Sequence, residues 1–373
     1  MEKAEFDMIV VGAGPAGSAC AVVAARAGAK VLLLEKDRFP RHKVCGEFVS
    51  PESLQLLAWL LEGEGFLDRP EISHARVFSA GARSSLPIVP EARSIPRFDL
   101  DAALLHAARR AGAKTGENAG VRQIEPCQVE SGEPFRVKTA ETALTARAVV
   151  NATGRWSELT EHSPGKKSHR WIGLKGHFYE AGPPRSVDLY IFDGGYCGVQ
   201  PVSENAINAC AMVRADAARS LQEVFSRQPE LWQRSRDWEP LFPAITTSPL
   251  YFRRPQTDSR GMLLAGDAAA FIDPFAGDGI SLALHSGSLA AKSLVPFFQG
   301  ADSLEHARTR YHTAYMKQFA PAFRNAARVR MMFSASSPVR SLLVRLAGLP
   351  PFARALVRGT RTRGELPESP GLP

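Results

Sequence analysis

The fold is decided by the opening stretch Phe6-Asp-Met-Ile-Val-Val-Gly-Ala-Gly-Pro-Ala-Gly17, in which a short apolar run leads directly into the pattern GxGxxG. The apolar run is typical of a buried strand, and the Ala-rich residues 18–27 are typical of a helix. A second apolar run, from Lys30 to Glu35, predicts another strand. The order strand, helix, strand within about thirty residues predicts a parallel sheet.

Two further helices are predicted from the sequence. One follows Asp99 as its N-cap and is closed by Gly112, with apolar residues at helical spacing between them. The other is a long helix from Gly279 to roughly Phe298, with small residues on one side.

The glycine pattern predicts a dinucleotide site at the end of the first strand. Gly12 makes the tight turn, Gly14 lets the backbone approach a pyrophosphate, and Gly17 permits close packing of the helix. The helix N-terminus offers free N–H groups and a positive dipole end to that anion. Glu35 ends the second strand, where a carboxylate accepts hydrogen bonds from ribose hydroxyls and repels a 2′-phosphate. The expected contacts are Gly12, Gly14, Pro15, Ala16, Gly17, Glu35 and Lys36, and they favour FAD or NAD over NADP.

Composition supports a packed α/β enzyme and excludes several other classes. Hydrophobic residues make up 45% of the 373 residues and charged residues 23%, as in ordinary globular proteins. The five cysteines form no CxxC pair and the nine histidines are scattered, so no metal site is predicted. The net charge of +8 comes from residues 321–364, which hold nine arginines and no acid. Because the rest of the chain is nearly neutral, nucleic acid is not an expected partner.

The sequence predicts a cytoplasmic protein with a basic C-terminal region. No run reaches the roughly 18 apolar residues of a spanning helix, and the acidic start does not resemble a signal peptide. From Arg324 to Arg358, apolar residues interleave with arginines and are interrupted by Pro338 and Pro350, which predicts short amphipathic helices. These helices either pack on the body or rest on an anionic membrane. The sequence leaves both alternatives open and does not give the oligomeric state.

Three further motifs carry a resemblance to a known family. They are Arg41-His-Lys-Val-Cys-Gly-Glu47 with Ser50-Pro51, Arg97-Phe-Asp-Leu-Asp101, and Gly266-Asp-Ala-Ala-Ala-Phe-Ile-Asp-Pro-Phe-Ala-Gly-Asp-Gly279. Over residues 5–295 the chain resembles the FAD-dependent superfamily of geranylgeranyl reductases, aromatic hydroxylases and flavin-dependent halogenases. The geranylgeranyl reductase-like branch is the most similar. The resemblance implies that the cofactor is FAD.

The resemblance also assigns cofactor contacts. It implies that Asp267 bonds the ribitol chain and that the helix after Gly277 and Gly279 points its N-terminus at the flavin, where reduction places negative charge. Asp278 is expected only to cap that helix. Arg97 and Arg41 are implied phosphate or ribitol contacts, with Lys43 as an alternative to Arg41, and the segment 151–157 is implied to lie near adenosine. The implied set is Arg41, Cys45, Gly46, Arg97, Thr153, Gly154, Gly266, Asp267, Gly277, Gly279 and Ile280.

The implied fold is a Rossmann-like FAD-binding domain with a parallel sheet, plus an antiparallel substrate-binding sheet and a helical C-terminal region. The α/β pattern returns after residues 168–213, where aromatic and β-branched residues alternate, so the FAD-binding domain is discontinuous. We expect the FAD-binding domain at 1–65, 95–165 and 255–300. The substrate-binding sheet is expected at 66–94 and 166–254, the basic helices at 301–363, and a disordered tail at 364–373.

The candidate catalytic residues follow from the same resemblance. Cys45 and Gly46 match a Cys-Gly pair beside the isoalloxazine of geranylgeranyl reductases, and Arg41, His42 and Lys43 would give the thiol a positive environment. Asp273 to Gly277 would lie over the flavin. In that loop Pro274 would fix the backbone, and Phe275 would exclude water.

The substrate pocket departs from the family pattern. Residues 194–201 fall where prenyl reductases carry Tyr-x-Trp-x-Phe-Pro; Tyr196 and Pro201 match, but Gly198 replaces the Trp and Gln200 replaces the Phe. This pocket would be more open and more polar, which favours an oxygenated aromatic or polyketide-like substrate over a bare isoprenoid.

Two reactions on a hydrophobic or aromatic small molecule are supported almost equally by the sequence. One is hydride transfer from FAD to a carbon–carbon double bond, and the other is hydroxylation through a flavin hydroperoxide. A non-catalytic electron-transfer protein or sensor is the alternative from another class. NAD(P)H is a candidate transient electron donor, because the chain has no second GxGxxG.

Overall fold

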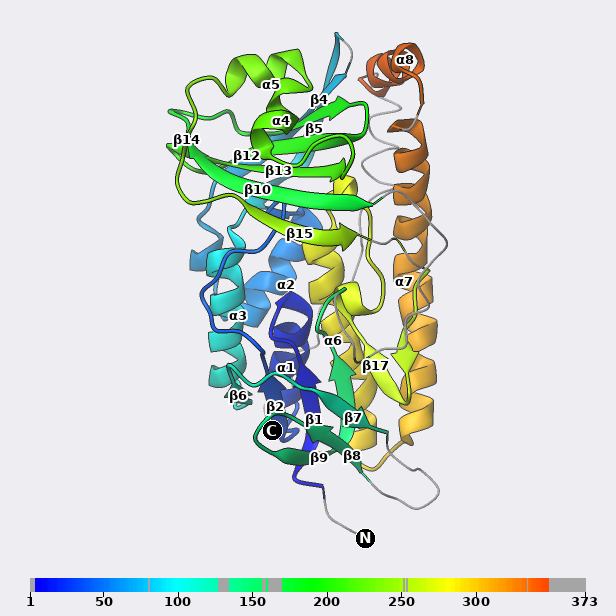
Figure 1. The fold of residues 1–373 in the computed structure, drawn as a ribbon. Helices are drawn as coiled ribbons and strands as arrows, with labels where there is room; N and C mark the ends of the chain where they lie inside the picture. Colours follow the sequence, from blue (N-terminus) through cyan, green and yellow to red (C-terminus); the bar gives the residue numbers. More distant parts are fainter. Residues whose placement is uncertain are drawn as a thin grey trace.

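Two stacked sheets form the body of the protein in the computed structural model (Figure 1). The structure describes residues 4–79, 81–126, 134–155, 159, 170–250, 252, 254–333 and 335–348. Trp156 and Ser157 of the 151–157 motif, Pro350 and the expected tail 364–373 lie outside the described residues.

The lower sheet in Figure 1 is the parallel sheet predicted from the first 35 residues. Its order is β16-β17-β9-β1-β2-β6, and strands β17, β9, β1, β2 and β6 run parallel to their neighbours. A β7-β8 hairpin extends β9 in antiparallel pairing. The strands are β1 (Phe6–Val11), β2 (Val31–Leu34), β6 (Lys114–Gly116), β7 (Gln123–Glu125), β8 (Phe135–Lys138), β9 (Ala143–Asn151), β16 (Asp258–Ser259) and β17 (Met262–Leu264).

The upper sheet is antiparallel except where β11 runs parallel to β4. Its order is β14-β10-β13-β12-β11-β4-β5-β3, with β15 pairing to β10. Residues on β12 alternate between two faces, so one face packs into a core under α4 and α5 while the other roofs the lower sheet. The strands are β3 (Phe48–Val49), β4 (Glu71–Ser79), β5 (Ala82–Ser94), β10 (Trp171–Tyr179), β11 (Ser186–Phe192), β12 (Gly195–Ser203), β13 (Ala206–Arg214), β14 (Glu239–Pro240) and β15 (Ile245–Leu250).

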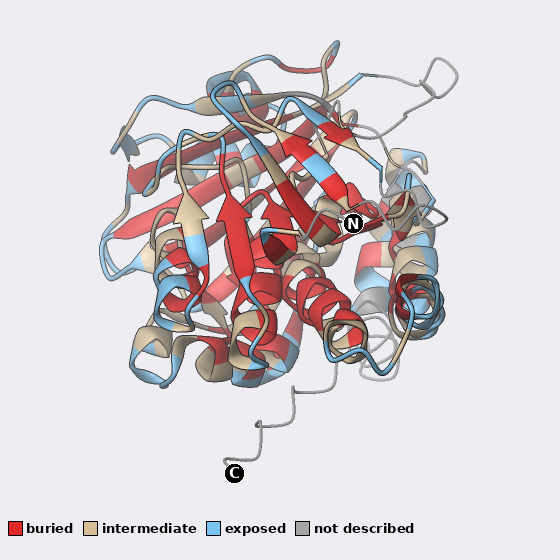
Figure 2. Ribbon diagram, turned by 90° about the horizontal axis from the view of Figure 1, so that it is seen from below, coloured by how far each residue is buried: buried red, intermediate tan, exposed pale blue. Residues whose placement is uncertain are grey.

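Helices bury the apolar strands of the lower sheet, as the red residues of Figure 2 show. The long helix expected at Gly279 to Phe298 has those bounds. The helix expected behind Asp99 instead begins at Arg97, because Pro96 is its N-cap, and the Asp99 carboxylate pairs with Arg69. The helices are α1 (Pro15–Arg26), α2 (Pro51–Leu61), α3 (Arg97–Arg110), α4 (Leu221–Ser226), α5 (Pro229–Arg234), α6 (Gly279–Phe298), α7 (Leu304–Phe333) and α8 (Ser337–Ala347), with short 3-10 turns η1 (Gly65–Leu67), η2 (Gly266–Ala268) and η3 (Pro274–Ala276).

The C-terminal region differs from the short helices that its sequence predicts. Residues 304–333 form one long helix, α7, which runs beside both sheets in Figure 1. Its inner face is a stripe of buried residues at helical spacing that includes Tyr311, Tyr315 and Phe319, and this packing outweighs the interruption by Pro321. In the described part of this region, α8 is the short helix that the sequence predicts, and it packs on β4 and β5. Contact with a membrane stays a prediction, and no helix in the described ranges is long and apolar enough to cross one.

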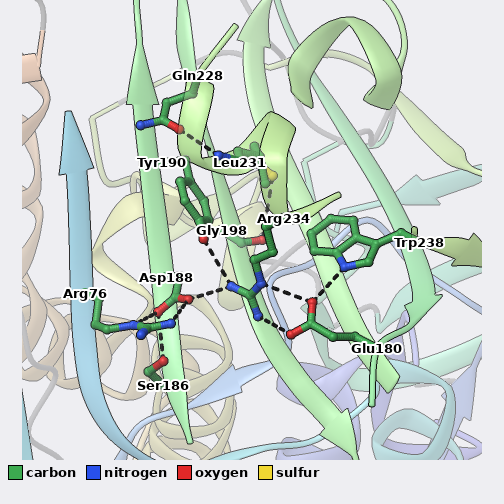
Figure 3. Close-up of polar contacts among 11 residues, drawn as sticks. Arg76, Glu180, Ser186, Asp188, Tyr190, Gly198, Gln228, Leu231, Arg234 and Trp238 are labelled. Carbon is green, nitrogen blue, oxygen red and sulfur yellow. Dashed lines mark hydrogen bonds and ion pairs between the residues drawn. The ribbon is translucent and has the colours of Figure 1, made fainter. Parts of the chain in front are cut away.

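A polar cluster fixes α5 to the outer face of the upper sheet (Figure 3). The fully buried Asp188 carboxylate accepts hydrogen bonds from Arg76 and from Arg234 of α5. The Arg234 guanidinium also donates to Glu180, whose carboxylate accepts the Trp238 indole N–H at 2.7 Å. Two acids therefore balance two arginines, and the network has no excess charge to offer a ligand.

Candidate active site and cofactor cavity

A cavity of about 1160 Å³ lies between the two sheets. Its floor is formed where β1, β9 and β17 end, at Gly12, Ala152 and Gly266, and its roof by β11, β12 and β13. The carboxyl ends of parallel strands are where open α/β sheets bind ligands. The volume exceeds that of a pocket for one small ligand, so it accommodates a dinucleotide and a second molecule.

The GxGxxG turn has the close packing that its glycines predict. Gly12 has a φ of +98°, and a Cβ there would lie 2.6 Å from the Ala152 carbonyl oxygen. A Cβ on Gly17 would lie 1.8 Å from the Gly12 carbonyl oxygen, so only glycine lets α1 start this close to β1. The first turn of α1 carries no side-chain cap, which leaves its N–H groups to the cavity.

Glu35 is buried at the end of β2, as predicted. One carboxylate oxygen accepts the Ala13 N–H at 2.8 Å, which ties it to the glycine turn. The other accepts the Asp37 N–H and the Arg41 guanidinium, the latter at 3.0 Å. Arg41 lines the cavity, and its charge is already paired with Glu35 and Asp37.

Arg97 and Lys43 lie next to the glycine turn and differ in their pairing. The Arg97 guanidinium makes two hydrogen bonds of 2.7 Å to Asp101 and lies 3.8 Å from the place of a Cβ on Gly14. Burial alone would lower its pKa, but the Asp101 carboxylate raises it, so Arg97 stays charged. The Lys43 amine makes no hydrogen bond or ion pair within the described residues, and burial and the charge of Arg97 lower its pKa to about 8. Lys43 therefore leaves one uncompensated cation where a diphosphate would lie.

The opposite end of the floor is formed by η2, η3 and the start of α6. Asp267 faces the cavity with Arg155, whose guanidinium lies 3.8 Å from its carboxylate and 4.4 Å from the centre of the Phe271 ring. Asp278 occupies the N-cap position of α6, but its side chain makes no cap bond and accepts the Ser50 hydroxyl at 3.1 Å. The helix N-terminus at Gly279 and Ile280 is therefore open to the cavity and suits an electron-rich ring.

The turn Cys45-Gly46-Glu47 sits between floor and roof and is held from both sides. The Asn208 amide of β13 donates to the carbonyls of Cys45 and Gly46, each at 3.0 Å. The Glu47 N–H donates to the Cys45 sulfur at 3.3 Å, and the Arg97 guanidinium also interacts with the Cys45 side chain. Glu47 adopts a positive φ of 62°, which is uncommon outside glycine and marks a locally constrained backbone.

The Glu47 side chain is the centre of a buried charged cluster that sequence reasoning missed. Its carboxylate binds the Lys175 amine, the His177 ring at 2.8 Å and the Arg97 N–H at 2.8 Å. Burial alone would raise the pKa of Glu47, but the hydrogen bond from His177 and the Lys175 charge lower it. Lys175 and His177 lie 128 and 130 residues from Glu47 in sequence, and Arg97 lies 50 residues away, so no local motif indicates these partners.

His42 does not give Cys45 the positive environment expected from residues 41–43. Its ring stacks on Phe242 with centroids 3.9 Å apart and packs beside Phe98. Burial and the charges of Lys175 and His177 lower the pKa of His42, so its ring is neutral at neutral pH. The cation beside Cys45 is Arg97.

The roof carries the residues predicted to contact substrate, with one correction. Tyr196, Gly198 and Gln200 line the cavity, and the Gln200 amide donates to the Ser94 hydroxyl at 2.6 Å. Pro201 is not among the lining residues, because neighbours along a strand point to opposite faces. The Phe275 ring meets the Tyr196 ring edge to face, with centroids 5.2 Å apart.

The cavity thus brings together nearly all of the predicted site. Gly17 is the other exception, since it packs α1 and does not line the cavity. The predicted residues found in the lining are Gly12, Gly14, Pro15, Ala16, Glu35, Lys36, Arg41, Cys45, Gly46, Arg97, Thr153, Gly154, Tyr196, Gly198, Gln200, Gly266, Asp267, Pro274, Phe275, Gly277, Gly279 and Ile280. Their individual roles stay predictions.

Comparison with known proteins decides the family. A model of the FAD-binding domain family matches residues 5–326, which is most of the chain. The chain belongs to this family. The geometry fits FAD independently: an uncapped helix N-terminus and the unpaired Lys43 suit its diphosphate, and the uncapped start of α6 suits its ring.

Relatives of this FAD-binding chain include reductases. Digeranylgeranylglycerophospholipid reductase 2 of Methanopyrus kandleri is 26% identical over 360 residues, covering 89% of this chain and 88% of the relative. The menaquinone reductase of Mycobacterium tuberculosis is 28% identical over 316 residues, covering 77% and 76%. Together with the family match, these relatives identify the chain as an FAD-dependent oxidoreductase.

Solved structures share the fold of this FAD-dependent oxidoreductase. The flavin-dependent brominase Bmp2 is 19% identical, with a TM-score of 0.79 over 95% of this chain and 93% of that protein. A geranylgeranyl bacteriochlorophyll reductase-like protein of Thermoplasma acidophilum is 20% identical, with a TM-score of 0.78 over 95% of both chains. The predicted fold, a parallel FAD-binding sheet assembled from discontinuous segments under a mainly antiparallel sheet, is confirmed. The domain limits stay a prediction.

Proposed function

We propose that this enzyme reduces a carbon–carbon double bond of a hydrophobic or aromatic small molecule. The observation that carries the proposal is the position of the Cys45-Gly46 turn, which lines the cavity between the floor that fits FAD and the apolar roof. Reduced FAD, when bound, supplies a hydride to one carbon of the double bond while a proton completes the other. A transient donor such as NAD(P)H restores the reduced cofactor.

The chain's own residues would bind, orient and shield the reactants. The roof offers Leu189, Met212 and Leu250 to an apolar substrate, and burial there excludes water. Asn208 and Glu47 fix the Cys45-Gly46 turn, so its geometry is set before substrate arrives. Pro274 and Phe275 close the cavity beside the expected flavin ring.

Oxygen-dependent hydroxylation is the second candidate, and one observation favours it. Gln200 brings an amide into a roof that is otherwise apolar, and the small Gly198 leaves space beside Leu189. These features suit an oxygenated aromatic substrate. The two reactions differ in their use of oxygen.

Oxygen dependence provides the test. Holoenzyme reduced with one equivalent of dithionite under strict anaerobiosis is mixed with benzylideneacetone, an aromatic enone, and the return of the oxidised flavin absorbance is followed. The proposal predicts that the enone reoxidises the flavin without oxygen, with one molecule of the saturated ketone formed per flavin. Substrate-dependent oxygen uptake with a hydroxylated product, and no anaerobic reoxidation, would identify the second candidate.

A further inference from the structure

The Tyr196 hydroxyl is a buried donor without an acceptor. Tyr196 lies on β12, is 9% exposed and lines the cavity. Its hydroxyl has no hydrogen-bond partner among the described residues. Buried polar groups in folded proteins are almost always paired, so an unpaired buried hydroxyl on a residue that lines a cavity suits a ligand atom as its partner.

The surroundings of Tyr196 favour an oxygen acceptor on the ligand. Met212, Leu250 and Phe271 belong to the same apolar cluster, and the Phe275 ring lies perpendicular to the Tyr196 ring. The nearby Gln200 amide is occupied by its hydrogen bond to Ser94. Apart from the Asp273 carboxylate, whose charge acts on Tyr196, this end of the cavity is apolar, so the phenol O–H would fix the orientation of an otherwise apolar ligand.

We propose that Tyr196 donates a hydrogen bond to a carbonyl oxygen of the substrate, so that the enzyme selects double bonds conjugated to a carbonyl, as in enones and quinones, over isolated alkenes. This inference rests on the proposed reduction of a double bond. It names the class of substrate that the site binds, and it makes Tyr196 a catalytic residue that contacts the reacting substrate.

The chemistry of conjugate reduction needs such a donor. When hydride adds to the β-carbon, the electron pair of the double bond moves toward the carbonyl, and its oxygen becomes negative. A proton from water then joins the α-carbon, which leaves a saturated ketone from an enone; the corresponding product of a quinone rearranges to the hydroquinone. A fixed donor in a dry pocket stabilises the oxygen charge without reorganisation. Burial and the charge of Asp273 raise the pKa of Tyr196 well above its usual value, so the phenol stays protonated and can donate the hydrogen bond.

Ligand binding tests the proposal without requiring turnover. Oxidised holoenzyme is titrated with menadione and with methylnaphthalene, a hydrocarbon of matched shape without carbonyls, and dissociation constants come from the change in flavin absorbance. The hydrogen bond predicts about tenfold tighter binding of menadione. It also predicts a lower carbonyl stretching frequency for bound menadione in infrared difference spectra. Tyr196→Phe should lose both effects.

A matched control separates this role from a structural one. Tyr190 is a buried tyrosine of the same sheet whose hydroxyl pairs with Arg234 outside the cavity, so Tyr190→Phe should keep both effects. In ligand-free protein, Tyr196→Phe should have an equal or higher Tm, because the removed hydroxyl has no partner. A lower Tm with an unchanged preference for menadione would overturn the proposal.

The inference and the proposed function fail in different ways. If menadione binds with a shifted carbonyl stretch but no enone reoxidises the flavin, the reaction is wrong and the Tyr196 contact stands. If isolated alkenes are reduced as readily as enones, and Tyr196→Phe changes neither rate, the reaction stands and the Tyr196 contact is wrong.

Discussion

The two ends of the cavity are built in different ways. At the dinucleotide end, the site is formed by the backbone N–H groups and glycines of one continuous segment, residues 12–17. Glu35, at the end of the next strand, adds a carboxylate. At the substrate end, side chains of β10 and β13 meet the Cys45-Gly46-Glu47 turn across long stretches of sequence. The cofactor end therefore depends on local backbone geometry, whereas the substrate end depends on side-chain pairs between residues far apart in sequence.

The largest expected effect is at the cofactor end, where one glycine is needed for helix packing and another for contact with the cofactor. Gly17→Ala places a Cβ 1.8 Å from the Gly12 carbonyl oxygen, so α1 must move and both folding and FAD binding should be lost. Gly14→Ala places its Cβ in ordinary van der Waals contact with the Arg97 guanidinium, 3.8 Å away, so the fold should survive while the new methyl group keeps the diphosphate from the backbone. Circular dichroism and FAD titration measure the two properties. Equal Tm values for both variants would contradict the distinction.

A smaller effect tests the buried charges at the substrate end. Glu47→Gln leaves the fully buried Lys175 without a counter-charge and should lower the free energy of unfolding by about 3–5 kcal/mol in urea denaturation. Adding Lys175→Met should restore most of this loss, because no lone charge remains. Asp188→Asn in the cluster of Figure 3 should also destabilise, but without changing the flavin absorbance spectrum. A Glu47→Gln variant with unaltered stability would show that the cluster contributes no net stabilisation.

The smallest effect is a pH dependence at the cofactor end. The Lys43 amine has a pKa of about 8 in the FAD-free protein, and a bound diphosphate favours its protonated form. FAD binding therefore takes up a proton above pH 8, so affinity should be constant below that pH and fall by up to about tenfold per pH unit above it. Lys43→Met should bind FAD more weakly, with a flat profile. Lys138→Met, which removes a surface pair with Glu125, is the control and should keep the wild-type profile.

Sequence predicts the cofactor end well because its signals are local. The run of β1, GxGxxG and β2 fixes strand, turn and acid within one segment, and α6 has the predicted bounds. The predicted start of α3 was wrong, because Pro96 is the N-cap and the Asp99 carboxylate pairs with Arg69 instead. The continuous α7 was not predicted because its buried stripe begins at Leu304 and Ala307, upstream of Arg324, where the predicted amphipathic pattern begins.

The substrate end could be located from sequence but not assembled. Alternation along β12 brings Tyr196, Gly198 and Gln200 to one face, and the same rule removes Pro201 from it. The partners of Glu47 could not be inferred, since Lys175 and His177 read as ordinary residues of a strand. Nor does a sequence show that the Tyr196 hydroxyl has no partner, because that follows only from the packing of every neighbour.

The cavity lining runs from Val11 to Ala283, and this span has a consequence for biosynthesis. A nascent polypeptide cannot complete the pocket until about the first 280 residues have left the ribosome, so flavin loading is a late event. Because a ligand that binds only the native form stabilises it by mass action, the supply of riboflavin-derived cofactor should set how much of this protein accumulates in folded form in the cell.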